Sequence, residues 1–263
     1  MPPIEIIMNL EIKQQLFIVG GATSGFGGAI ARQLVEEGAH IIAIARTKAK
    51  LQTLQAIAPN QIEIIAGDLS QAATIDKIME QIGDRAIAGA LINGGGPPAN
   101  PALDTTMEEW DEAYQKILRW KVDLTKRLMP KMMAQKYGRL VYIESVTVKQ
   151  PIANLVLSNS IRMAVVGFVK TLSDEVVGHG ITLNIIGPGY HNTPAVDRIF
   201  NKRAEQTGLS PQAVRANFES ALKIGGMGDP ADLGSLALWL LSPVSRYVTG
   251  QTIVVDGGFM RGV

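Results

Sequence analysis

The sequence predicts an α/β protein with a Rossmann-type, doubly wound parallel sheet of about seven strands and helices on both faces. Three observations favour this fold. Short apolar runs alternate with longer helical patterns along the 263 residues, and glycine-rich turns follow the first and fourth runs. Chemistry-bearing residues stand where several of the runs end. Because alternating strands and helices build parallel sheets with right-handed crossovers, a ligand site is expected outside the carboxyl ends of the strands.

The expected elements follow one another without a linker or an internal repeat, so 1–263 is interpreted as a single domain. The runs that predict strands are 16–19, 40–45, 61–66, 87–92, 139–144, 181–186 and 252–255. Helical patterns, several closed by glycine or proline, cover 29–37, 50–57, 72–82, 106–136, 157–177 and 231–241. The more polar segment of about 190–228 is expected to cover a substrate site.

The first glycine-rich turn joins the first strand to the first helix and reads VGGATSGFG from Val19 to Gly27. Gly21 lets the chain turn sharply, and Gly25 removes a side chain where backbone would approach a pyrophosphate. The helix that follows offers unpaired N–H groups and a positive dipole end to phosphates. The spacing is G-x-x-x-G-x-G rather than G-x-G-x-x-G, and a plain turn is the alternative interpretation.

Composition argues against several classes of function. A net charge of +1 gives no reason to expect a nucleic acid or an acidic membrane surface as a partner. The absence of cysteine excludes disulfides and thiolate metal sites and suits a cytoplasmic protein. No apolar run has the length of a membrane span, and the first residues do not resemble a signal peptide. Since His40, His179 and His191 do not cluster like ligands, no metal is expected.

From about residue 10 to 258 the chain resembles a short-chain dehydrogenase/reductase. The motifs that carry the resemblance are GGATSGFG (20–27), Asp68-Leu69, NGGG (93–96), Trp110, GRLVYIES (138–145), PGYHNT (188–193) and VTGQTIVVDGG (248–258). The resemblance is nearest to ketoacyl-carrier-protein reductases and related ketone reductases. It implies an oxidoreductase that transfers a hydride between NADP(H) and a small carbonyl or alcohol substrate, with 3-oxoacyl compounds as one candidate.

The resemblance also implies which residues bind the cofactor. They are Gly21, Thr23, Ser24, Gly25 and Phe26 at the phosphates, Asp68 and Leu69 at the adenine, Asn93, Gly94 and Gly95 under the ribose, and Pro188, Gly189, Tyr190 and Thr193 at the nicotinamide amide. A helix cap is the alternative role for Asp68.

Arg46 indicates the choice between NAD and NADP. An acidic residue at the end of the second strand would bind the adenosine ribose and repel a 2′-phosphate, but Ala45 and Arg46 stand there. A guanidinium can form a forked pair with phosphate and stack on adenine, so NADP(H) is the expected cofactor. A solvated surface arginine is the alternative.

The chain departs from the family at three of four catalytic positions. The family uses asparagine, serine, tyrosine and lysine; the matching positions here are Ile117, Ser145, Ser158 and Arg162. A serine hydroxyl is a far weaker acid than a phenol, whose pKa is about 10. Arg162 can hold ribose hydroxyls but does not exchange a proton near neutral pH. Ser145 is expected to donate a hydrogen bond to the substrate oxygen.

A reductase with a displaced proton donor is therefore the first hypothesis. Lys149, on the loop after Ser145, is the candidate donor, and Ser158 could pass its proton along. Burial and the nearby charge of Arg162 would lower the pKa of such a lysine, whereas a solvated loop lysine is the alternative. Tyr142 and Tyr190 are the other candidates, with Tyr142 on the opposite face of its strand from Ser145.

Two further hypotheses remain. The loss of three catalytic positions favours a weak or inactive NADP-binding protein that acts as a sensor or assembly partner, and dehydration or isomerisation on the same fold is the third. The resemblance implies a homotetramer, in which helices 106–136 and 155–178 pair across one two-fold axis and 231–258 across another. A homodimer through the long helices alone is the alternative.

Overall fold

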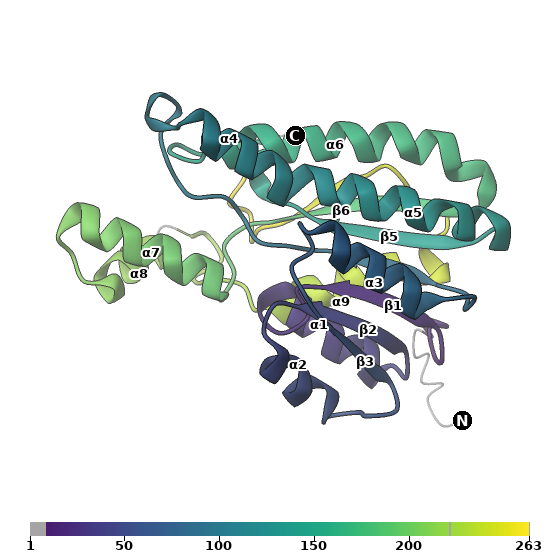
Figure 1. Ribbon diagram of the computed structural model, residues 1–263. Helices are drawn as coiled ribbons and strands as arrows, with labels where there is room; N and C mark the ends of the chain where they lie inside the picture. The colour runs from purple at the N-terminus through teal and green to yellow at the C-terminus, as the bar shows by residue number, and fades with distance from the viewer. Residues whose placement is uncertain (1–8, 221, 263) are drawn as a thin grey trace, which may run out of the picture.

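The computed structural model describes residues 9–220 and 222–262, and within them the chain forms one seven-stranded sheet in the order β3-β2-β1-β4-β5-β6-β7 (Figure 1). Every neighbouring pair is parallel. The strands are β1 (Leu16–Gly20), β2 (His40–Ala45), β3 (Ile62–Ala66), β4 (Gly89–Ile92), β5 (Gly138–Ile143), β6 (Ile181–Pro188) and β7 (Thr252–Val255). The doubly wound fold predicted from the sequence is confirmed.

Helices cover both faces of the sheet. They are α1 (Gly25–Glu36), α2 (Lys48–Gln55), α3 (Ala72–Ile82), α4 (Met107–Ala113), α5 (Trp120–Gln135), α6 (Val156–Val176), α7 (Pro194–Thr207), α8 (Pro211–Glu219) and α9 (Pro230–Leu241). Figure 1 shows α5 and α6 over one face of the strands and α1 and α9 over the other. The chain builds outward from β1 to β3 and returns to place β4 beside β1, which makes the β1–β4 junction the switch in strand order.

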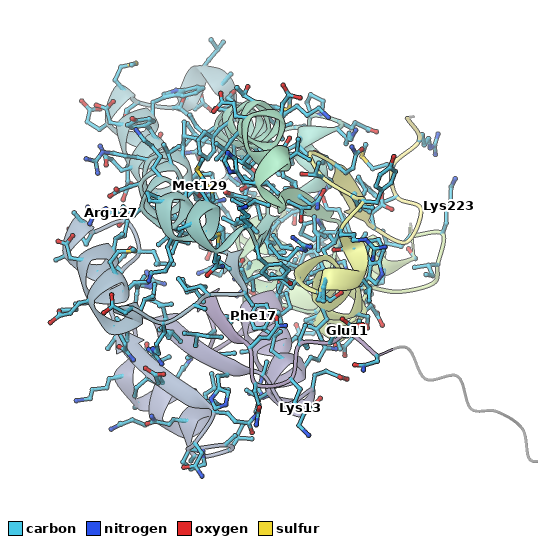
Figure 2. All side chains as sticks on the ribbon, turned by 90° about the vertical axis from the view of Figure 1, so that its right-hand side faces the viewer. Glu11, Lys13, Phe17, Arg127, Met129 and Lys223 are labelled. Carbon is cyan, nitrogen blue, oxygen red and sulfur yellow. The ribbon has the colours of Figure 1, made fainter. Side chains whose placement is uncertain are left out.

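Side chains of β1 alternate between two apolar cores, as the period of a strand requires. Phe17 and Val19 pack into the core under α1 and α9, and Ile18 packs into the core under α5 and α6. Figure 2 shows Phe17 inside the molecule and Arg127 on the outer side of α5. Burial on both faces explains why the strands are continuous apolar runs in the sequence.

The long helical pattern expected over 106–136 is interrupted. Thr106 caps α4 by accepting a hydrogen bond from the backbone N–H of Glu109, and the Glu109 side chain accepts one from the N–H of Thr106. A π-helical turn, Tyr114–Arg119, then separates α4 from α5. Such a turn holds one extra residue per turn and shifts the faces that later side chains present. Ile117 lies inside this turn and is fully buried.

The segment after β6 forms a helical pair that projects from the carboxyl edge of the sheet, at the left of Figure 1. Helices α7 and α8 enclose a small core of their own that contains Val196, Phe200 and Val214. Lys202 of α7 donates hydrogen bonds to the carbonyl oxygen of Ala99 (2.7 Å) and to Oδ1 of Asn100 (3.1 Å). The pair is therefore fastened to the loop that follows β4. Across the described ranges, no helix has the length and apolarity needed to cross a membrane.

Candidate active site

The turn between β1 and α1 is shaped for close approach by an anion. Gly21 and Gly25 have φ angles of +64° and +53°, which favour glycine, and a Cβ on Gly27 would lie 2.3 Å from the carbonyl oxygen of Gly21. Ser24, an exposed residue, precedes α1 without capping it through its side chain, and the first turn of α1 carries no acidic residue. The first N–H groups of α1 are thus left for a ligand such as a phosphate.

A second glycine turn follows β4 and is tied to the first. Asn93 donates a hydrogen bond from Nδ2 to the carbonyl oxygen of Gly20 (3.1 Å). A Cβ on Gly94 would lie 2.9 Å from the Trp120 ring, whereas one on Gly95 would meet open space. The two turns therefore stand side by side at the switch in strand order, where open α/β sheets bind their ligands.

Opposite charges follow the carboxyl ends of β2 and β3. Arg46 is exposed directly after β2, and Leu69 is buried against the first glycine turn. Burial alone would raise the pKa of Asp68, but hydrogen bonds from Ser70 and the charge of Arg46 outweigh it and hold this pKa below its ordinary value. Asp68 accepts from Ser70 and does not cap α3, whose first flanking residue is Gln71.

The residues at the end of β6 and just after it form the nicotinamide site that the resemblance implies. Thr193 is buried, and a Cβ on Gly25 would lie 3.5 Å from its methyl carbon. The Tyr190 ring packs edge-on against Phe218 and Phe259, with centroid distances of 4.1 and 5.2 Å. Tyr190 thus turns its ring toward the helical pair. Gly189 lies so close to Asp256 that a Cβ would be 2.6 Å from its side chain, and the preceding Pro188 is buried.

The structure brings Ser145, Ser158 and Arg162 into one hydrogen-bonded cluster beside the second glycine turn. Ser145 follows β5, and its Oγ accepts the backbone N–H of Thr147 (3.2 Å). Ser158 and Arg162 stand one turn apart on α6, where Arg162 Nε donates to Ser158 Oγ (3.1 Å). The hydroxyl of Thr147 lies 3.4 Å from that of Ser158. Arg162 Nη2 faces Gly96, where a Cβ would be 3.2 Å away.

Two charged residues of this cluster were missed by the sequence analysis. Glu144, immediately before Ser145, accepts hydrogen bonds from Arg162 Nη1 (2.9 Å) and from Nζ of Lys121 on α5. The exposed fractions of the side chains are 3% for Lys121, 0% for Glu144 and 10% for Arg162. Burial lowers the pKa of Lys121, with repulsion by Arg162 adding to the effect and attraction by Glu144 opposing it. These three side chains are called the buried triad below.

A signal for both residues is present in the sequence. Lys121 is spaced for the buried face of its helix, because Ile117, Leu124 and Leu128 stand four before, three after and seven after it. Glu144 is a charged residue that directly continues the apolar run of β5. A lysine and a glutamate in such positions need partners, since isolated buried charges are costly.

Lys149 does not meet the condition on which its proposed role depends. Its side chain is exposed on the turn after Val148 and is not desolvated there. The prediction of a desolvated donor at Lys149 is therefore corrected. Tyr142 is fully buried, its hydroxyl lies 2.7 Å from that of Thr125 on α5, and burial raises its pKa far above the ordinary value.

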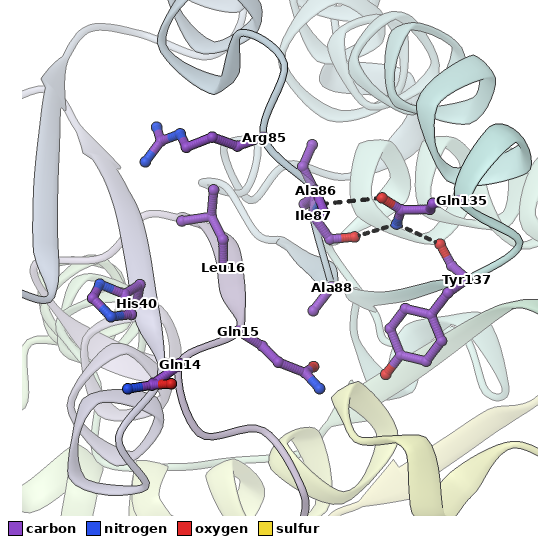
Figure 3. A pocket seen from close by; sticks show the side chains of 10 residues that line it. All are labelled: Gln14, Gln15, Leu16, His40, Arg85, Ala86, Ile87, Ala88, Gln135 and Tyr137. Atoms are coloured by element: carbon purple, nitrogen blue, oxygen red, sulfur yellow. Dashed lines mark hydrogen bonds between the residues drawn. The ribbon is translucent and has the colours of Figure 1, made fainter.

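A cavity of about 660 Å³ lies at the other edge of the sheet (Figure 3). It is lined by Leu16 and His40, which begin β1 and β2, and by Tyr137, which precedes β5. Gln135 closes one side through hydrogen bonds with the backbone of Ile87 and Tyr137. This cavity faces away from both glycine turns. In residues 9–220 and 222–262 no cluster of metal-ligating side chains occurs.

Known proteins are similar to this chain over nearly its whole length. Residues 21–260 match the family model described as enoyl-(acyl carrier protein) reductase. The 3-oxoacyl-[acyl-carrier-protein] reductase FabG of Vibrio harveyi is 28% identical over 253 residues, which cover 95% of this chain and 98% of the relative. Dehydrogenase/reductase SDR family member 6 of Xenopus laevis is also 28% identical, over 93% of this chain and 97% of its own.

A solved structure shares the fold. L-sorbose reductase from Gluconobacter frateurii, crystallised with NADPH and L-sorbose, superposes with a TM-score of 0.90 at 24% identity, covering 97% of this chain and all of its own. The family model spans nearly the whole sequence, including both glycine turns and the strand that leads to Ser145. The chain therefore belongs to the short-chain dehydrogenase/reductase family.

Proposed function

We propose that the protein is an NADP(H)-dependent oxidoreductase that interconverts a small ketone and its alcohol. The observation that carries the proposal is the cluster of Ser145, Ser158 and Arg162 beside two glycine turns that Asn93 ties together. Bound NADP(H) would supply or accept the hydride. The family membership supports this class of reaction, and the relatives named above include reductases.

The residues around the two glycine turns would suit a dinucleotide phosphate. The uncapped N-terminus of α1 and the glycines at 21 and 25 would hold the pyrophosphate, and the exposed Arg46 would hold the 2′-phosphate. Asn93, Gly94 and Gly95 would lie under the ribose, and Arg162, whose Nη2 would be 3.2 Å from a Cβ on Gly96, would hold ribose hydroxyls. The other residues proposed to contact the cofactor are Thr23, Ser24, Phe26, Asp68, Leu69, Pro188, Gly189, Tyr190 and Thr193.

Hydrogen-bond directions explain how the two serines would act on the substrate oxygen. Arg162 Nε can only donate a hydrogen bond, so Ser158 Oγ is the acceptor. Ser145 Oγ likewise accepts a hydrogen bond from the backbone N–H of Thr147. The Ser145 hydrogen is therefore left to donate, and so is the Ser158 hydrogen when the Thr147 hydroxyl, 3.4 Å away, donates to Ser158 Oγ. Two donors aimed at one carbonyl oxygen stabilise the negative charge that hydride addition creates there. Ser158 would then supply the proton, recovered from solvent.

The substrate pocket is assigned to the segment of about 190–228. Helices α7 and α8 stand at the carboxyl edge of the sheet, and Lys202 fastens them to the loop at Ala99 and Asn100. A 3-oxoacyl thioester is the substrate class that the FabG relatives suggest. The chain is proposed to form a homotetramer, with a homodimer as the alternative. The protein is proposed to be located in the cytoplasm.

The test combines cofactor binding with a substrate panel. NADPH fluorescence would give the dissociation constants of NADPH and NADH, and absorbance at the nicotinamide band would follow turnover. The panel contains acetoacetyl-N-acetylcysteamine, cyclohexanone, a 1,2-diketone and L-sorbose. Preference for NADPH and turnover of at least one ketone are expected. Binding of NADPH without turnover of any member would instead support the second candidate.

That second candidate is an NADP-binding sensor or assembly partner with little catalysis. One observation favours it: at the position where the resemblance implies a polar relay residue, Ile117 is fully buried in the π-helical turn. Ser158, at the tyrosine position, is also a weak acid. The intact cluster of hydrogen-bond donors around Ser145 favours the oxidoreductase.

A further inference from the structure

The buried triad is more elaborate than the proposed chemistry requires. Arg162 alone could bind a ribose hydroxyl and the Ser158 hydroxyl, yet Glu144 and Lys121 are also buried beside it. Removing three charged groups from water is costly, and the mutual attraction of such groups often only balances that cost. An arrangement of this kind at the end of β5, one residue from Ser145, calls for a function.

Every nitrogen of the Arg162 guanidinium has its own direction. Nη1 donates to Glu144 Oε2 at 2.9 Å, Nε donates to Ser158 Oγ at 3.1 Å, and Nη2 faces Gly96. A planar guanidinium cannot turn one nitrogen without turning the others. The bond to Glu144 therefore also fixes the other two nitrogens. Nε stays on the Ser158 hydroxyl, which acts on the substrate oxygen, and Nη2 stays on the side of Gly96, where the cofactor would bind.

Glu144 fixes Arg162 but also neutralises it. A buried carboxylate beside a guanidinium cancels its charge at short range, and a neutral pair would do little for a developing oxyanion. Lys121 binds the other carboxylate oxygen of Glu144 and adds a second cation. The three groups together then carry one net positive charge in a place with little water.

We propose that Glu144 and Lys121 are positioning residues for the hydride-transfer reaction. Glu144 orients Arg162 on Ser158, and Lys121 maintains a net positive charge behind the hydroxyl that donates to the substrate oxygen. The inference rests on the proposed function for the identity of the reaction, but the orientation and the charge are properties of the protein without substrate.

The surroundings of Lys121 give the proposal a pH dependence. The groups that face its ammonium are Glu144 from the end of β5, Arg162 from α6 and the ring of Trp120, 5.8 Å away on its own helix. The hydroxyl of Tyr142 lies on the same strand as Glu144 and is bound to Thr125. Because burial lowers the pKa of Lys121, its proton is lost at a lower pH than that of an exposed lysine. The triad then becomes neutral, and turnover falls.

The first test needs no substrate. In ¹⁵N-labelled protein, the Nε–H resonance that Arg162→Lys removes belongs to Arg162. We expect it to exchange slowly with water in the wild type and in Lys121→Met, and rapidly in the double variant Lys121→Met/Glu144→Leu, which keeps the net charge but removes the anchor. The double variant also avoids the two unpaired cations that could prevent Glu144→Leu from folding. An unchanged resonance in the double variant would overturn the positioning role of Glu144.

The charge of Lys121 is measured in the same way. The lysine side-chain resonance lost in Lys121→Met is followed from pH 6 upward, with exposed Lys126 on the same helix as the reference. We expect Lys121 to be charged at pH 7 and to titrate below Lys126. A neutral Lys121 at pH 7 would overturn its proposed role.

The second test uses turnover of whichever panel ketone the wild type reduces. Lys121→Met should lower kcat roughly ten- to a hundredfold, a loss comparable to or smaller than that of one oriented oxyanion donor, with KM for NADPH within about twofold. The fall of turnover at high pH should be absent from this variant, and the matched control Lys126→Met should behave as the wild type. Wild-type kcat in Lys121→Met would contradict the inference. If the wild type reduces no panel ketone, the proposed function fails, while the resonance measurements still decide the roles of Glu144 and Lys121.

Discussion

Replacing Glu144 by leucine is expected to destabilise the protein strongly, because it leaves Lys121 and Arg162 as two buried cations without their shared carboxylate. The Glu144 side chain is 0% exposed and accepts from both partners. Removing one member of a buried ion pair typically costs about 3–5 kcal/mol. For a chain of this size that is a fall in Tm of about 6–20 °C.

A double-mutant cycle separates the stability that depends on the interaction of Lys121 with Glu144 from the contribution of each residue alone. Lys121→Met leaves Glu144 paired with Arg162, so its cost should be smaller than that of Glu144→Leu. In Lys121→Met/Glu144→Leu one buried cation, Arg162, is left without its carboxylate, so this variant should be more stable than Glu144→Leu, which leaves two, but less stable than the wild type. Urea unfolding at fixed protein concentration measures all three. The control is Glu63→Gln, which breaks an exposed pair with Arg85 and should cost about 1 kcal/mol or less.

The stability of the Glu144→Leu variant is expected to rise with pH. Without the carboxylate, burial and Arg162 both lower the pKa of Lys121 in the folded state below its value in the unfolded chain. The unfolded state then binds more protons between these two pKa values, so stability rises with pH across that range. Glu144→Leu should therefore recover stability as the pH is raised above 7. Equal stability of Glu144→Leu and the wild type, or a double variant no more stable than Glu144→Leu, would refute the reasoning.

Four further predictions concern the site and the assembly. Arg46→Asp should weaken NADPH binding more than NADH binding in fluorescence titrations, and tighter binding of NADH than NADPH by the wild type would contradict the role of Arg46. Ser145→Ala should lower kcat about a hundredfold with nearly unchanged NADPH affinity, whereas Lys149→Met should retain most turnover because that side chain is exposed. Sedimentation should give a tetramer at micromolar concentration, and a monomer there would exclude the paired-helix assembly.

The strands and the glycine turns could be predicted from the sequence because local patterns determine them. Strands buried on both faces are continuous apolar runs, and the turn after β1 needs glycine where φ is positive, as at Gly21 and Gly25. The boundaries were less accurate. Helix α1 begins at Gly25, four residues before the apolar pattern indicates, because three of its first four residues are glycines, which carry no side chain to show the pattern.

The interruption between α4 and α5 could not be predicted from periodicity. The buried residues Ala113, Ile117, Trp120, Leu124 and Leu128 follow one another at spacings of three and four, which is the period of an unbroken α-helix, although the π-helical turn at Tyr114–Arg119 lies among them. The sequence pattern therefore looks like a single helix. The reason for the turn lies in tertiary packing, which a local pattern does not contain.

The buried triad was missed for a different reason. Lys121 and Glu144 are 23 residues apart in the chain, and a lysine in a helix is ordinarily solvated. Only the sheet, by placing α5 and α6 over the end of β5, brings both to Arg162. Lys149 was chosen instead because it is close to Ser145 in the sequence, and closeness in sequence did not provide the burial that its role required.

The side chains of Lys121, Glu144, Ser158 and Arg162 are consistent with one another when charge and hydrogen-bond direction are considered together. A serine cannot replace the acidity of a phenol, but a serine whose oxygen accepts from a fixed guanidinium keeps its hydrogen for the substrate. An arginine could not keep that orientation without Glu144, and the pair would be neutral without Lys121. A serine at the position where the resemblance implies a tyrosine is thus explained only together with its three charged neighbours, and a substitution at any one of them should impair the contribution of the others. Non-additive effects of Ser158→Ala and Lys121→Met on kcat would be the kinetic sign of this dependence.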